Sequence, residues 1–270
     1  MMIVWFTSLA LAAPSPSSSC TLETEKPPSP SGRYKLRGDM VNLRAQPNTS
    51  APVLAELPLA STVQLAGCVK HERIGRNEGC WYKIDEVVGR GIDERYESAF
   101  LFFTAIATCY ISGDFDEDGV REEVFLSQTG TEEYQVRISD PNARVPVTWV
   151  TEEAFSNYTI LSSVDKSEAG RPLISLSTSP EACDYMGYDH HYLYEGSGKP
   201  ALHKAVTGLT ASGEGGYITT TIDWRDDGTL ILSEDQTESS STQRYCLQGY
   251  RYEPCGVKRV LRKVASGTGG

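Results

Sequence analysis

The chain has 270 residues, of which 39% are hydrophobic, and it carries a formal net charge of −11 at pH 7. This length and composition predict one or two soluble domains with enough apolar residues for a core. The negative charge argues against nucleic-acid partners, because an acidic protein is repelled by the phosphate backbone, and it disfavours anionic membrane surfaces for the same reason.

The N-terminus begins with an apolar segment, MMIVWFTSLALA, at residues 1–12. This segment is too short to span a bilayer but suits the apolar region of a secretory signal, and Ala10-Leu11-Ala12 supplies a small-x-small cleavage site. We therefore expect an exported protein, located in the periplasm or on the cell surface. The alternative is a disordered apolar N-terminus on a cytosolic protein.

Cys20 follows this segment, directly after Ser17-Ser18-Ser19. Its position resembles that of the lipid-carrying cysteine of bacterial lipoproteins, which implies a lipid anchor as the protein's contact with a membrane. The alternative is cleavage after Ala12, which leaves Cys20 free. Residues 13–33 are rich in Pro and Ser, so we expect a flexible, extended tether there.

From Tyr34 onward, short runs of β-branched and aromatic residues are separated by Gly, Pro, Asp and Asn, as strands are by turns. No long amphipathic helical pattern interrupts them, so the predicted fold class is all-β. Residues 104–264 are expected to form a larger antiparallel β domain, a sandwich or barrel-like, before a disordered tail at 265–270. The expected strands lie at residues 41–45, 62–69, 80–88, 122–127, 133–139, 171–178, 190–195, 216–224, 229–234 and 244–253.

Two stretches, MVNLRAQPNTSAPVLAELPLASTVQL at 40–65 and CWYKI at 80–84, resemble the motifs of bacterial SH3-type (SH3b) domains. The matching residues are Val41, Asn42, Arg44 and Pro47 in the first motif and Trp81, Tyr82 and Ile84 in the second. The resemblance implies a small SH3-like barrel over residues 34–103 that binds cell-wall peptide or another protein.

Within this SH3b-like unit, the resemblance places Asn42, Trp81 and Tyr82 near the ligand side. We expect Tyr82 to be exposed and Trp81 to belong mainly to the core. Ile92 stands where the family has a tryptophan that often faces the ligand. A barrel that has lost ligand binding is therefore the alternative.

The stretch GDFDEDGVREE at 113–123 has the pattern D-x-D-x-D-G-x-x-E. Alternate carboxylates in a tight turn converge, and oxygen ligands suit a hard cation. An EF-hand is excluded, because its twelfth position is Phe125 and the flanks are strand-like. The pattern resembles the calcium loops of FG-GAP-type repeats, which implies calcium ligands at Asp114, Asp116, Asp118, Glu122 and the carbonyl of Val120. The alternative is an acidic β-turn without a metal.

Seven cysteines in an exported chain predict disulfides. Cys68 and Cys80 are expected at the facing ends of two adjacent strands, and Cys246 and Cys255 bracket a strand and a turn, so each pair is expected to form a bridge. Zinc binding is the alternative for the first pair, although His71 alone lies nearby.

Residues 179–196 resemble a P-E-A-C segment of uncharacterised exported bacterial proteins. This resemblance implies that Cys183 is structural and pairs with Cys109, so that Cys20 is left over. His190 and His191 are adjacent in an expected strand, where they point to opposite faces and cannot share a metal.

Motifs of known hydrolases are missing from the sequence: no cysteine stands in a D-C-S context, and G-x-S-x-G, H-E-x-x-H and a complete P-loop do not occur. We therefore expect no catalytic residues, and no cofactor beyond a structural calcium ion. The predicted function is that of a non-catalytic exported cell-envelope protein. The alternative is a cryptic cell-wall hydrolase, since two catalytic carboxylates can come from anywhere in a chain.

Overall fold

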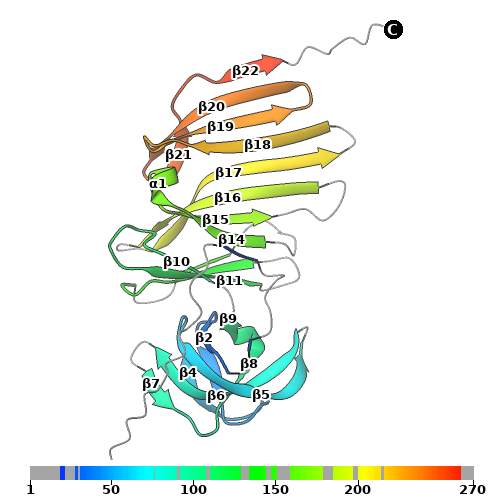
Figure 1. Ribbon diagram of the computed structural model, residues 1–270, viewed down its shortest axis with the longest axis vertical. Helices are drawn as coiled ribbons and strands as arrows, with labels where there is room; N and C mark the ends of the chain where they lie inside the picture. Colours follow the sequence, from blue (N-terminus) through cyan, green and yellow to red (C-terminus); the bar gives the residue numbers. More distant parts are fainter. Residues whose placement is uncertain are drawn as a thin grey trace, which may run out of the picture. The chain divides into compact units, whose positions relative to one another are not determined.

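The fold is given by a computed structural model, and its ribbon is shown in Figure 1. The structure describes residues 19–21, 28–29, 31–75, 77–89, 92–107, 110–128, 134–143, 147–150, 159–178, 185–196, 200–213 and 216–262. The chain divides into two compact units: the first contains Lys26–Thr108, and the second joins Ser17–Glu25 to Cys109–Gly270. The boundary lies a few residues beyond the expected one. The expected signal (1–12) and tail (265–270) lie outside the described residues.

The first unit is an antiparallel sheet of eight strands in the order β4-β3-β8-β6-β5-β2-β9, with β7 paired to β6. Its elements are β2 (Arg33–Leu36), β3 (Val41–Arg44), β4 (Val53–Leu57), β5 (Thr62–Ile74), β6 (Asn77–Gly89), β7 (Ile92–Arg95), β8 (Phe100–Phe102), the 3₁₀ turn η1 (Phe103–Ala105) and β9 (Ile106–Ala107). Among the described residues, the strand pairing does not return to its first strand. The expected small barrel is therefore an open sheet, bent where bulges interrupt the β5–β6 ladder.

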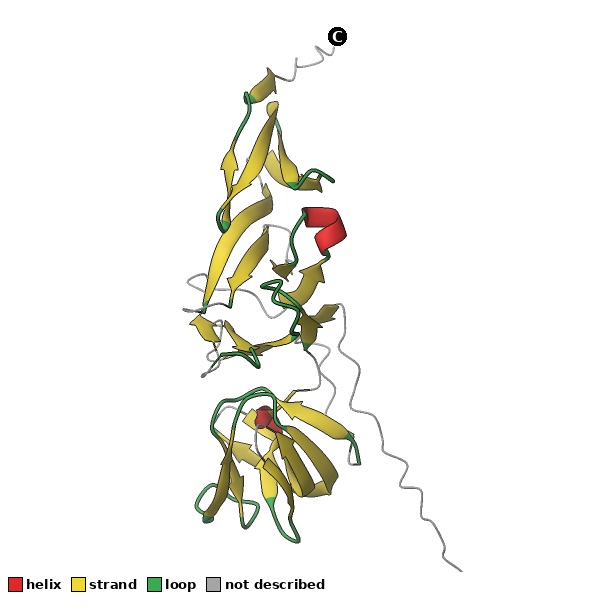
Figure 2. Cartoon of the chain, turned by 90° about the vertical axis from the view of Figure 1, so that its left-hand side faces the viewer, coloured by secondary structure: helices red, strands yellow, loops and turns green. Residues whose placement is uncertain are grey.

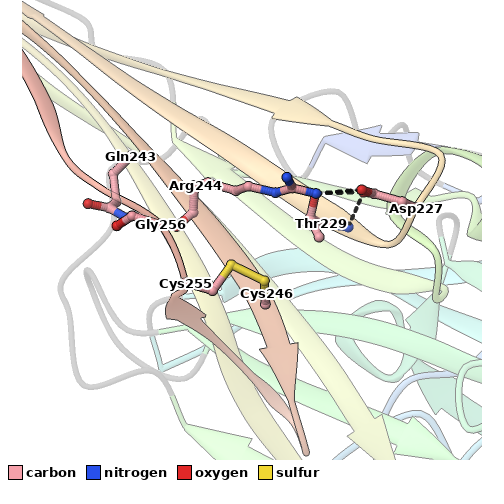
Figure 3. Close-up of a disulfide and its surroundings, with 7 residues drawn as sticks. All are labelled: Asp227, Thr229, Gln243, Arg244, Cys246, Cys255 and Gly256. Carbon is pink, nitrogen blue, oxygen red and sulfur yellow. Dashed lines mark hydrogen bonds and ion pairs between the residues drawn. A yellow bond between two sulfur atoms is a disulfide. The ribbon is translucent and has the colours of Figure 1, made fainter.

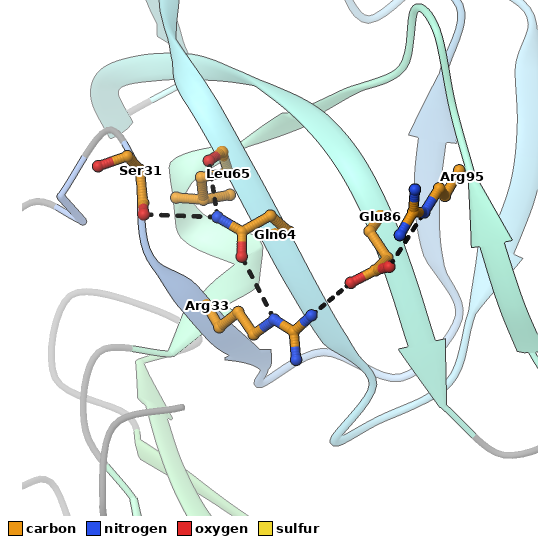
Figure 4. Close-up of polar contacts among 6 residues, drawn as sticks. All are labelled: Ser31, Arg33, Gln64, Leu65, Glu86 and Arg95. Carbon is orange, nitrogen blue, oxygen red and sulfur yellow. Dashed lines mark hydrogen bonds and ion pairs between the residues drawn. The ribbon is translucent and has the colours of Figure 1, made fainter. Parts of the chain in front are cut away.

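The core of the first unit consists of apolar side chains that alternate along these strands, as a sheet with one packed face requires. Among those with no exposed surface are Leu36, Leu43, Leu57, Val63, Ile84, Val87 and Leu101. On the sheet's surface, Glu86 accepts hydrogen bonds from Arg33 (2.6 Å) and Arg95 (3.3 Å), and Arg33 also donates to Gln64 (Figure 4). This network joins four strands, β2, β5, β6 and β7.

The second unit contains two antiparallel sheets. The four-stranded sheet has the order β10 (Ile111–Gly113), β11 (Glu122–Gln128), β12 (Tyr134–Ser139), β13 (Val147–Val150). The ten-stranded sheet follows the order β1 (Ser19–Thr21), β14 (Thr159–Val164), β15 (Leu173–Thr178), β16 (Tyr185–Glu195), β17 (Ala201–Gly213), β18 (Gly216–Trp224), β19 (Thr229–Gln236), β20 (Ser239–Gln248), β21 (Arg251–Pro254), with β22 (Arg259–Arg262) paired to β20. Strands dominate the described chain, and the all-β fold class is confirmed (Figure 2).

Two cores hold the second unit together. The first lies between the sheets and combines residues of the four-stranded sheet with residues of β14, β15 and β16, so this end of the unit is a two-layer sandwich. The second covers one face farther along the ten-stranded sheet, where the single-turn helix α1 (Lys166–Ala169) packs. There the hydroxyl of Tyr252 donates to the carbonyl of Ala169 at 2.9 Å.

The two local disulfides are present: Cys68–Cys80 links β5 to β6, and Cys246–Cys255 links β20 to the residue after β21. Figure 3 shows the second bridge, beside which the amide of Gln243 donates to the carbonyl of Gly256 at 2.8 Å. Each bridge closes a short loop, so both support local strand pairing.

The N-terminal segment differs from its expectation. Ser19–Thr21 is no tether: it is β1, which pairs antiparallel with β14 at the edge of the ten-stranded sheet. Cys20 packs against the first core and is disulfide-bonded. A sulfur in a disulfide cannot also carry a lipid, so the predicted lipid anchor at Cys20 is contradicted.

Cys109 and Cys183 lie outside the described residues. The predicted Cys109–Cys183 pairing therefore falls on residues that the structure does not describe.

Candidate metal centre

The aspartate loop connects β10 to β11, and its backbone is organised by its own carboxylates. Asp116 accepts from the N–H of Asp118 (3.2 Å), Asp114 from that of Gly119 (3.1 Å), and Asp118 from that of Val120 (2.7 Å). Gly119 has φ +88°, a conformation that favours glycine and permits the tight turn. These bonds draw alternate side chains to one side of the turn.

The four predicted side-chain ligands converge. One oxygen each from Asp114, Asp116, Asp118 and Glu122 lie within 4.8 Å of one another. Calcium holds its oxygen ligands at about 2.4 Å, so oxygens on opposite sides of an ion lie about 4.8 Å apart. The expected grouping is therefore present, and its oxygens lie no farther apart than the coordination shell of such an ion allows. The carbonyl of Val120 belongs to the same loop.

Glu122 is the deepest member of the cluster and has no exposed surface. Its Oε2 accepts the backbone N–H of Phe115 at 2.6 Å, which closes the loop, while its Oε1 is buried without a hydrogen-bond partner. Oδ1 of Asp114 is likewise buried and unpartnered. Buried carboxylate oxygens without partners are costly, and a cation bound between them would relieve that cost.

The electrostatics of the cluster agree with this geometry. Burial, together with the neighbouring charges of Asp116, Asp140 and Asp114, raises the pKa of Glu122 to about 7, although the hydrogen bond from Phe115 acts in the opposite direction. Burial and the nearby carboxylates also raise the pKa of Asp116. A divalent cation would reverse both effects, because it favours the charged carboxylate.

Glu117 points away from the cluster and connects the loop to the segment between β14 and β15 of the ten-stranded sheet. It forms ion pairs with Lys166 of α1 and, at 3.0 Å, with Arg171. These cations lower the pKa of Glu117. Beside these contacts is a pocket of about 450 Å³, to which Asp114 and Arg121 contribute.

The predicted ligand residues of the first unit do not share one surface. Asn42 is exposed on β3, but Tyr82, predicted to be exposed, is only 4% exposed, and its hydroxyl donates to the carbonyl of Pro28 at 3.0 Å. Trp81 is also buried, as its core assignment anticipates, and its indole N–H donates to Glu72 at 2.7 Å. The side chain of Ile92 lies outside the described residues.

The other candidate metal residues do not form a site. Cys68 and Cys80 are joined in a disulfide, so their thiolates are not available to zinc, although His71 lies 3.5 Å from the sulfur of Cys68. His190 stacks on Tyr188, whereas His191 packs edge-on against Trp224. The two histidines thus occupy opposite faces of β16, and burial lowers the pKa of His191 to about 4.

A scan against models of known protein families, a search of curated proteins and a search of solved structures each found no match to this chain. In the part of the chain that the structure describes, no helix has the length and apolar character needed to cross a membrane.

Proposed function

We propose that this chain is a non-catalytic exported protein whose second unit binds one structural calcium ion. The observation that carries the proposal is Glu122: a fully buried carboxylate with an unpartnered oxygen, grouped with three aspartates at the spacing of an ion's ligands. The two disulfides are compatible with an oxidising, extracellular location, where calcium is plentiful.

Calcium is expected to raise the melting temperature of the second unit. An ion at a hundred times its dissociation constant adds about 2.7 kcal/mol to the free energy of unfolding. That corresponds to roughly 5–10 °C for a unit of this size. Differential scanning calorimetry in EDTA and in millimolar calcium measures the shift, and magnesium is expected to give a smaller one because it demands tighter octahedral geometry.

Asp116→Asn removes the negative charge of one proposed ligand and should diminish the shift. Asp226→Asn is the matched control, because Asp226 is an exposed aspartate in the turn between β18 and β19. A wild-type protein whose melting temperature does not respond to millimolar calcium contradicts the proposal.

For the first unit we propose binding of cell-wall peptide, with another protein as the alternative partner. Asn42 supports this proposal, together with the exposed apolar side chains of Met40, Val53 and Leu54 around β3 and the edge strand β4. Aligned polar and apolar groups on an edge can hold an extended peptide.

Co-sedimentation of the full chain with purified peptidoglycan tests this surface. Leu54→Ser is expected to lower the bound fraction several-fold, whereas Val69→Ser, an equally exposed apolar site on β5, should not. Equal loss in both variants, or no binding by the wild type, contradicts the proposal. Clearing of the suspension would instead favour the alternative, a cell-wall hydrolase. The pKa of Glu122, about 7, suits a general acid, but this side chain is too buried to reach the glycosidic oxygen of a substrate.

A further inference from the structure

A fifth carboxylate borders the cation site and comes from outside the aspartate loop. Asp140, which follows β12, is 1% exposed. Its Oδ1 accepts the backbone N–H of Asn142 at 2.6 Å, and its Oδ2 accepts the hydroxyl of Tyr194 at 2.9 Å. Asn142 also donates from its side chain to Asp118 at 2.5 Å, so the turn after β12 touches the loop directly.

The position of Gly196 shows that Asp140 faces the cluster. A side-chain carbon at Gly196 would lie 1.9 Å from Oδ2 of Asp116 and 3.2 Å from Oδ2 of Asp140. The two carboxylates therefore converge on one small space, which stays open because residue 196 has no side chain. The charge of Asp140 also contributes to the raised pKa values of Asp116 and Glu122.

We propose that Asp140, fixed in place by Tyr194, is a positioning carboxylate beside the cation site that strengthens ion binding without coordinating the ion, and that the bound ion thereby ties the four-stranded sheet to β16. This inference rests on the proposed calcium binding. Tyr194 has no exposed surface and belongs to the core between the two sheets, so its hydroxyl position is fixed by packing. Burial and the bond to Asp140 raise the pKa of Tyr194, which keeps this hydroxyl a donor.

The coupling between the two sheets follows from the elements that supply these residues. The loop belongs to the β10–β11 connection and Asp140 to the end of β12, whereas Tyr194 and Gly196 lie on and after β16 in the ten-stranded sheet. A cation that neutralises carboxylates from both the β10–β11 loop and the end of β12 would stabilise the packing of the two sheets as well as the loop. Calcium should therefore slow amide hydrogen exchange in β16 as well as in the loop.

Isothermal titration calorimetry of the full chain with calcium tests the proposal. Asp140→Asn keeps the shape of the side chain and is expected to weaken calcium binding by about 10- to 100-fold. Terbium luminescence should show the same number of coordinated waters in this variant as in the wild type, because Asp140 does not coordinate the ion. Tyr194→Phe should weaken binding by a smaller factor, and it keeps the test open if Asp140→Asn does not fold.

Tyr252→Phe is the matched control for Tyr194→Phe, since it also deletes a buried tyrosine hydroxyl bond in the same unit, but that hydroxyl donates to the carbonyl of Ala169 in α1 and not to a carboxylate of the cluster. It should lower the melting temperature without changing the calcium affinity. If the wild type binds calcium and Asp140→Asn binds it equally well, Asp140 does not strengthen ion binding and this inference fails while the calcium site stands. If the wild type does not bind calcium, both fail.

Discussion

Phe115→Ala is expected to lower the free energy of unfolding of the second unit by about 3–5 kcal/mol, the usual effect of truncating a buried phenylalanine. Phe115 is 1% exposed and lies within the aspartate loop, yet its ring packs into the core between the two sheets. Its backbone N–H also donates to Glu122. Truncation should therefore release the loop from the core, and urea unfolding in EDTA and in calcium should show a diminished calcium response.

Phe125→Ala is the control for this loss. Phe125 is equally buried on β11, but its ring stacks on Tyr110 at 5.4 Å and does not anchor the loop. Phe125→Ala should destabilise the unit by a similar amount and keep the calcium response. Phe115→Leu, a milder truncation, should also keep the calcium response. Equal calcium affinity in Phe115→Ala and Phe125→Ala would show that core packing of Phe115 does not position the ligands.

In the first unit, the sequence predicts strands well and exposure poorly. Alternation along CWYKI correctly places Trp81 and Tyr82 on opposite faces, but it implies that one face meets solvent. Instead the ring of Phe102 lies 5.4 Å from that of Trp81, and the core covers Tyr82 from the other side. The covering residues come from distant positions, which no local pattern reports.

In the second unit, the strands that the sequence misses are those with weak local signals. β17 reads ALHKAVTGLTASG, rich in residues that are uncommon in strands, yet it pairs along β16 over its full length. β1 lies in a Pro- and Ser-rich stretch, where composition predicts a tether. Its backbone pairing with β14 and the bridged Cys20 determine its position, and composition reports neither.

Some residues of the candidate metal centre could likewise be predicted from the sequence, and others could not. The ligands from Asp114 to Glu122 are predictable, because a tight turn with alternating aspartates brings them together locally. Asp140 and Gly196 are not, since they reach the site only through the pairing of β12 with β11 and the packing of β16. The Asp140-Pro141-Asn142 turn is visible in the sequence, but nothing there connects it to the loop.

Glu122→Gln is expected to change the pH dependence of stability in the absence of calcium. The folded protein holds the pKa of Glu122 at about 7, above its ordinary value of 4.5, so the folded state retains a proton that the unfolded state releases between these values. The free energy of unfolding therefore falls as the pH rises from about 4.5 to about 7, with a total loss on the order of 3 kcal/mol. A neutral glutamine avoids this loss.

Urea unfolding in EDTA from pH 5 to pH 8 measures the difference between wild type and Glu122→Gln. The variant should gain stability relative to the wild type across this range, and the gain should level off above pH 7. Saturating calcium should reverse the order at pH 7.5, because the wild type gains an ion that glutamine binds poorly. Parallel pH profiles of the two proteins in EDTA would mean that Glu122 ionises in the folded state as easily as in the unfolded chain. Its burial would then carry no electrostatic cost that a bound cation could relieve, which contradicts the prediction.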